Sequence, residues 1–271
     1  MKILPTIGPA SEKLNDLKFL FKYCSMARLN TSHNNISWHK KVIKLIKKVD
    51  KNIDILVDIP GVKPRTNNKK NIYLKKNNII KFGYKLKKKN EVHIELTRKL
   101  PRKKGKFNKF FSLDDGKIIF KTIKFTKNEI IGKALHDCII QPKKGLNIPN
   151  SIYDNYEQEK IYIEYLKKFA KTNINAVGLS FVQNKELIVL LKKKFSKFLM
   201  ISKIENSEGL KNAEEICKYS DAIMIDRGDL SAEIGDNNLY DAILKISNLT
   251  KKYGKPLIMA TENLETLSSF N

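Results

Sequence analysis

Cysteine is scarce in this sequence of 271 residues, and no two cysteines have the spacing of a metal site or a redox motif. Cys24, Cys138 and Cys217 are odd in number and far apart, which favours packed, reduced thiols and disfavours a structural zinc site. The sequence also has no run of about 20 apolar residues, the length that a membrane-spanning helix needs. Its first residues lack the charged and apolar segments of a secretory leader. We therefore expect a cytoplasmic protein with no membrane segment.

Acidic residues are outnumbered, with 28 Asp and Glu against 53 Lys and Arg, which gives a net charge of +25. A strongly basic surface attracts polyanions such as nucleic acids. The lysines are spread over expected helix faces and turns, for example at 40–48 and 87–89, and do not form one patch. This spread indicates a solvated surface that helps to gather phosphorylated substrates, and we do not expect a nucleic-acid partner.

Apolar runs of strand length alternate with amphipathic helical segments in both end portions of the chain. Such alternation with short connections predicts a parallel sheet whose faces are covered by helices. From about residue 67 to residue 141, short alternating runs separated by Lys, Asn and Gly are typical of an antiparallel sheet. We divide the chain into a first barrel part (1–66), an inserted β domain (67–142) and a second barrel part (143–271). The seven expected parallel strands are 3–7, 26–29, 53–58, 176–181, 199–205, 222–225 and 256–261.

Charged side chains close two of these expected strands. Lys203 and Glu205 are two residues apart, so a strand directs both to the same side. Asp229 lies just past the next strand, where it can join Glu205 as an oxygen ligand for Mg²⁺. In barrels of alternating strands and helices, chemistry is done at these strand ends. A metal beside a lysine is suited to phosphate chemistry.

Eight short segments, each at an expected strand end or in the inserted domain, occur in an order that resembles the pyruvate kinase family. The resemblance extends over nearly the whole chain and implies an α/β fold, a TIM-type barrel of apparently seven strands. An all-β lid domain is inserted after strand three, and the eighth strand and the C-terminal domain of the family are missing. The segments are TIGPAS (6–11), ARLNTSH (27–33), RT (65–66), DDG (114–116), KKGLNIP (143–149), SKIENSEG (202–209), RGDL (227–230) and AT (260–261).

The resemblance implies the glycolytic transfer of a phosphoryl group from phosphoenolpyruvate to ADP, which gives pyruvate and ATP. Glu205 and Asp229 match the ligands of the family's Mg²⁺, which Mn²⁺ can replace. Lys203, Thr261 and Arg28 match catalytic positions, and Thr261 is expected to orient a water. The matching substrate-binding residues are Gly228, Asp229, Arg28, Ser180, Phe181 and Thr261, and the matching nucleotide-binding residues are Asn30, His33, Arg65, Lys144 and Asp115.

The resemblance also includes the family's K⁺ site, matched by Asn30, Ser32, Asp58 and the carbonyl of Ile59. Lys63, however, stands where potassium-dependent relatives have a glutamate. A fixed ammonium there can replace the charge of the ion, so we expect K⁺ not to be strictly required.

Two further departures, Asp226 and Glu262, add negative charge near the expected metal. Asp226 replaces a small residue, and Glu262 stands where glutamine is usual. Each either tightens metal binding or repels the substrate.

A seven-stranded barrel leaves two sheet edges with unpaired backbone groups. Either a second copy of the chain or another polypeptide covers them, or the chain is a fragment or the product of a decaying gene. Three other functions stay open: a catalytically impaired or silent barrel that binds phosphoenolpyruvate or pyruvate, a non-kinase pyruvate-handling enzyme such as a C–C lyase, and a basic scaffold or nucleic-acid-binding protein that retains only the fold. Lys203 and Glu205 could also be no more than a buried ion pair, and residues 114–116 no more than a hairpin turn.

Overall fold

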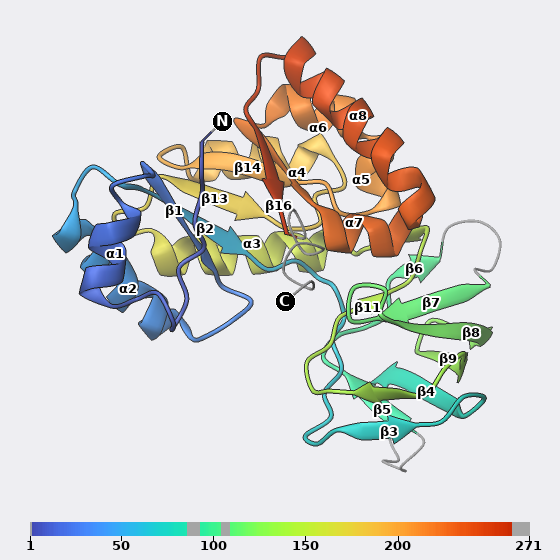
Figure 1. Ribbon diagram of the computed structural model, residues 1–271. Coiled ribbons are helices and arrows are strands. Elements are labelled where there is room, and N and C mark those ends of the chain that lie inside the picture. The colour runs from blue at the N-terminus through green and yellow to red at the C-terminus, as the bar shows by residue number, and fades with distance from the viewer. Residues whose placement is uncertain (1, 86–92, 104–108, 262–271) are drawn as a thin grey trace.

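The computed structural model describes residues 2–85, 93–103 and 109–261 (Figure 1). Its α/β part is built on one curled sheet of six parallel strands, with helices packed on the outside of the curl. Consecutive strands along the chain are neighbours in the sheet, as in a barrel. The strands, in sheet order, are β1 (Met26–Asn30), β2 (Asp54–Ile59), β13 (Ala176–Leu179), β14 (Leu199–Lys203), β15 (Ala222–Asp226) and β16 (Leu257–Ala260).

The expected count of seven strands is wrong for the part of the chain that the structure describes. Residues 3–7 form only one parallel bridge, between Thr6 and Arg28, with one backbone hydrogen bond on each side. Pro5 and Pro9 have no N–H group to donate, which keeps this pairing short.

Four of the described helices begin at an Asn or Asp whose side chain caps the helix. The side chain of Asn35 accepts a hydrogen bond from the N–H of Trp38, and Val42, Ile43 and Ile46 of the same helix are buried. Asp154 caps the helix that follows the β-rich part in the same way. The helices are α1 (Leu14–Leu20), α2 (Ile36–Val49), α3 (Asn155–Phe169), α4 (Lys185–Lys194), α5 (Ser207–Lys211), α6 (Ala213–Tyr219), α7 (Arg227–Ile234) and α8 (Asp236–Lys252).

The described residues between 66 and 152, called here the β segment, form strands and turns and no helix. The main sheet has the order β11-β7-β8-β9-β4-β5. The sequence led us to expect only antiparallel pairs in this sheet. That expectation is wrong for one pair, because β4 and β5 run parallel. An alternating pattern of apolar residues is the same for both strand directions and does not distinguish them. The strands are β3 (Ile72–Leu74), β4 (Ile79–Tyr84), β5 (His93–Leu96), β6 (Arg102–Lys103), β7 (Phe110–Leu113), β8 (Ile118–Phe125), β9 (Glu129–Ala134), β10 (Cys138–Ile140), β11 (Leu146–Asn147) and β12 (Ser151–Ile152).

Separate apolar cores stabilise the two parts. In the β segment, Phe82, Phe111 and Phe120 are fully or almost fully buried, and the rings of Phe111 and Phe120 stack with centroids 5.0 Å apart. In the α/β part, the outer face of the sheet packs on the helices, and a smaller cluster that includes Leu56 and Met224 fills the inner face. Among the described residues, no helix is both long and apolar enough to cross a membrane.

Candidate active site

A cavity of about 500 Å³ lies between the carboxyl ends of the parallel strands and the β segment. Figure 1 shows the β segment beside that edge of the α/β part. Residues that follow or close all six strands line one side, and residues 114–115 and 141–145 line the other. The parallel strands thus bring to one place side chains that are far apart in the sequence.

Lys203, at the end of β14, lies among carboxylates. Its Nζ is 2.8 Å from Glu205 Oε1, 3.2 Å from Asp58 Oδ2 and 3.4 Å from Asp226 Oδ2. It also donates a hydrogen bond to Ser180 Oγ at 3.2 Å. Burial alone would lower the pKa of Lys203, but the three carboxylates raise it well above its usual value. The ammonium is therefore charged at every physiological pH.

Asp58, at the end of β2, joins Lys203 to Arg28. The Arg28 guanidinium donates to Asp58 Oδ2 from Nε at 3.0 Å and from Nη2 at 2.5 Å. Burial would raise the pKa of Asp58, but Lys203 and Arg28 lower it below its usual range. Asp58 is thus a carboxylate shared by two buried cations, a role that the sequence alone did not reveal.

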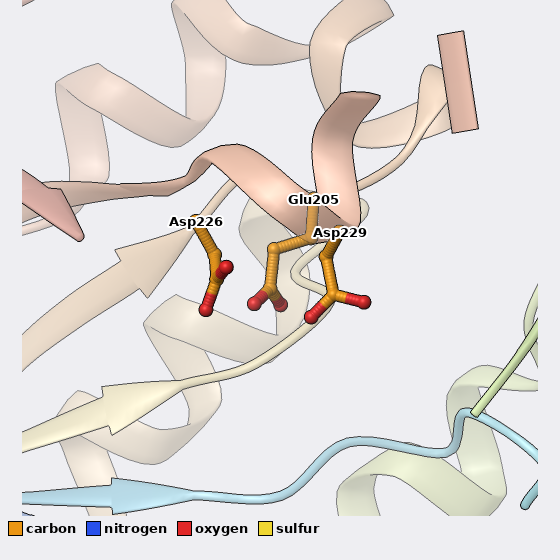
Figure 2. A group of neighbouring side chains, drawn as sticks. All are labelled: Glu205, Asp226 and Asp229. Atoms are coloured by element: carbon orange, nitrogen blue, oxygen red, sulfur yellow. The ribbon is translucent and has the colours of Figure 1, made fainter. Parts of the chain in front are cut away.

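Glu205, Asp226 and Asp229 place three carboxylates side by side (Figure 2). One oxygen from each lies within 4.8 Å of the others. Burial, reinforced by Asp229 and Asp226, raises the pKa of Glu205 to about 8, and burial also raises the pKa of Asp226. Glu205 Oε2 accepts the N–H of Phe181 at 2.6 Å, and Oε1 lies 2.8 Å from Lys203 Nζ. Three carboxylates this close together offer the oxygen ligands that a hard divalent cation prefers.

Lys63, in the loop after β2, reaches one of these three carboxylates, that of Asp229. Its Nζ lies 2.5 Å from Asp229 Oδ1 and 3.0 Å from Asp115 Oδ1 in the β segment. Burial would raise the pKa of Asp229, but the ammonium of Lys63 lowers it below its usual value. A Cβ on Gly145 would lie 2.5 Å from Lys63 Cε, so this path for the lysine requires a glycine there.

Comparison with known proteins accounts for this arrangement. Residues 1–270 match the family model described as "Pyruvate kinase, barrel domain". This chain belongs to the pyruvate kinase family. Among its curated relatives, the pyruvate kinase of Buchnera aphidicola is 33% identical over 98% of this chain and 59% of the relative. The pyruvate kinase of Thermococcus litoralis is 30% identical over 99% of this chain, and that of Thermotoga maritima is 30% identical over 98% of it. Both matches cover 59% of the relative. The chain thus spans about three fifths of the length of these pyruvate kinases.

Other residues that match pyruvate kinase motifs also lie at the cavity. Ser180 and Phe181 follow β13 and line the cavity, whereas Gly228 does not line it but is buried in the first turn of α7, next to Asp229, which does. The Thr261 hydroxyl donates to Asp226 Oδ1 at 2.7 Å. Residue 262, the second expected departure, lies outside the described residues.

The residues that match nucleotide-binding positions of pyruvate kinases lie around the rim. Asn30 and His33 line the cavity, and Arg65 donates to the carbonyl of Lys143. Lys144 pairs with Asp114 at 2.9 Å. The hairpin turn at 114–116, which joins β7 to β8, thus also carries acidic side chains to the cavity.

Three of the four expected K⁺ ligands, those of Asn30, Asp58 and Ile59, contact other groups of the protein. Asn30 Oδ1 accepts the N–H of Ser32, and the carbonyl of Ile59 accepts the N–H of Ser180. Among the residues that the structure describes, Lys63 pairs with Asp229 and Asp115, whereas Asp58 pairs with Arg28 and Lys203.

Sequence reasoning missed the support beneath Ser180 and Phe181. Gln158 of α3 donates to the carbonyls of Ser180 and Phe181 at 2.7 and 2.9 Å, and the Tyr162 hydroxyl donates to the same Ser180 carbonyl. Phe181 has φ +60°, which a non-glycine residue adopts rarely, so these bonds hold a strained turn. The available signal was a glutamine on the buried face of an amphipathic helix.

Proposed function

We propose that this protein is a phosphotransferase of the pyruvate kinase type, which transfers the phosphoryl group of phosphoenolpyruvate to ADP and gives pyruvate and ATP. The observation that carries the proposal is the buried Lys203 ammonium, 2.8 Å from Glu205, in the cavity at the strand ends of a barrel of this family. A fixed cation and adjacent metal ligands are what phosphoryl transfer needs, because its catalysis is mainly positioning and charge stabilisation.

Glu205 and Asp229 are the residues that would hold Mg²⁺ or Mn²⁺. The closeness of their oxygens, which lie within 4.8 Å of each other, and the lowered pKa of Asp229 support this assignment. When bound, the ion supplies positive charge to the phosphate and enol oxygens of the substrate.

The side chains around this metal site have separate tasks. Lys203 neutralises the charge of the phosphoryl group in transit and of the enolate left behind. Arg28 binds a phosphate oxygen, in an orientation fixed by its two hydrogen bonds to Asp58. The N–H groups at Gly228 and Asp229 bind the substrate carboxylate, since a helix start presents free donors and a positive partial charge. Thr261 orients a water near the enolate.

The rim of the cavity binds the nucleotide. Asn30, His33, Arg65 and Lys144 meet its phosphates, and Asp115 approaches the site from the β segment. In this proposal residues 67–142 are a lid, and residues 1–66 and 143–271 are the two barrel parts. The Lys63 ammonium supplies the positive charge that K⁺ supplies in other members, and the reaction is placed in the cytoplasm.

The test is a lactate-dehydrogenase-coupled assay of purified protein with phosphoenolpyruvate, ADP and Mg²⁺. Wild type forms pyruvate, and Lys203→Met lowers the rate by about 10³-fold or more, because the variant lacks the charge at the reacting group. Lys171→Met is the matched control, since Lys171 is exposed. Absence of pyruvate in the wild-type sample refutes the activity. Thermal stabilisation by phosphoenolpyruvate with Mg²⁺ in that case identifies a silent binding protein instead.

A further inference from the structure

The charged groups enclosed around Lys203 do not balance. Four carboxylates, those of Asp58, Glu205, Asp226 and Asp229, face three cations, those of Arg28, Lys63 and Lys203. Arg28 neutralises Asp58, to which Lys203 adds a contact at 3.2 Å, and Lys63 neutralises Asp229. Glu205 and Asp226 therefore share one ammonium, and uncompensated charge in a buried site is costly.

The lysine at Asp229 also removes an oxygen from the proposed metal site. Asp229 Oδ1 lies 2.5 Å from Lys63 Nζ, so a cation held only by Glu205 and Asp229 has fewer free oxygens to bind. Asp226 lies within reach of the same ion, because its oxygen is within 4.8 Å of those of the other two acids (Figure 2). Two oxygens on one Mg²⁺ are at most about 4.2 Å apart, so small side-chain adjustments close the set.

We propose that Asp226 is a third carboxylate ligand of the divalent cation that Glu205 and Asp229 hold. The inference rests on the metal site of the proposed function. Asp226 Oδ1 accepts the Thr261 hydroxyl, and Oδ2 lies 3.4 Å from Lys203 Nζ. A carboxylate has about four lone-pair sites, so both contacts leave an oxygen lone pair for the ion. Glu205 likewise keeps free lone pairs on both oxygens beside its contacts with Lys203 and the N–H of Phe181, so all three acids can turn an oxygen to the same ion.

The experiment measures Mn²⁺ binding to the full chain without substrate, by the electron paramagnetic resonance signal of free Mn²⁺. Wild type binds one Mn²⁺, and Asp226→Ala weakens the affinity at least about tenfold, since even outer-shell changes at metal sites cost 10- to 100-fold. Asp226→Asn keeps an acceptor for Thr261, is nearly the same size, and also weakens binding. Asp241→Asn, an exposed residue of α8, is the matched control for the change of charge.

Wild-type affinity in either Asp226 variant overturns the inference, as does a wild-type protein that binds no Mn²⁺ without substrate. Thermal melting shows whether each variant is folded. Glu205→Gln separates this result from the proposed function. If it abolishes Mn²⁺ binding while the Asp226 variants retain it, the metal site stands and only the third ligand is rejected. Pyruvate formation in the coupled assay tests the activity independently.

Discussion

Glu233 makes the stability of this protein depend on pH, in a range that can be calculated. Its side chain is buried in α7, and Oε1 accepts hydrogen bonds from the N–H of Asn150 at 3.0 Å and from Ser207 Oγ at 3.2 Å. Burial raises the pKa of Glu233 from 4.5 to about 7, although these hydrogen bonds oppose the change. The folded protein therefore holds a proton that the unfolded chain releases at a lower pH.

The difference in the pKa of Glu233 between the folded and unfolded states sets the sign and size of the change in stability. Below pH 4.5 both states are protonated at this group, and its contribution to stability is fully present. As the pH rises to about 7 the unfolded chain ionises first, so the free energy of unfolding falls. The pKa values of 4.5 and about 7 correspond to a loss of about 3 kcal/mol, at about 1.4 kcal/mol for each pH unit.

Glu233→Gln removes this dependence, because its amide oxygen still accepts both hydrogen bonds and carries no charge. At pH 8 the variant is expected to be more stable than wild type by up to about 3 kcal/mol, and near pH 4.5 the two are expected to be equal. Urea unfolding followed by circular dichroism at pH 4.5, 6, 7 and 8 measures this. Glu186→Gln, an exposed glutamate, is the control. A constant difference between Glu233→Gln and wild type at all four pH values refutes the reasoning.

Two other changes test the buried charges. Asp58→Asn leaves Arg28 and Lys203 without their shared carboxylate and is expected to lower the free energy of unfolding by about 3–5 kcal/mol. Urea unfolding beside Asp54→Asn, an exposed residue of the same strand, checks this, and a loss below about 1 kcal/mol contradicts it. Pyruvate formation is expected to be nearly equal in potassium and tetramethylammonium salts, because Lys63 already places an ammonium beside Asp229. A large stimulation by K⁺ in the coupled assay rejects that role.

Several elements of the fold could be predicted from short stretches of sequence. The helix expected at 36–49 is confirmed as α2, because its cap at Asn35 and the apolar spacing of Val42, Ile43 and Ile46 are local features. The parallel strands after residue 150 are also close to their expected ranges. The strand expected at 3–7 and the direction of β5 were wrong, because pairing and direction depend on the neighbouring strand.

The sequence by itself predicted that Lys203 and Glu205 would face the same side, because they are two residues apart at a strand end. The two side chains do meet, although Glu205 lies just beyond β14. The sequence also placed Asp229 at the start of the helix after the next strand. Only the tertiary structure decided that Lys63 pairs with Asp229, 166 residues away, and that Asp58 links Arg28 to Lys203. The partner of a buried charge depends on which chain segments the fold brings into contact, and side-chain spacing along one strand carries no information about that.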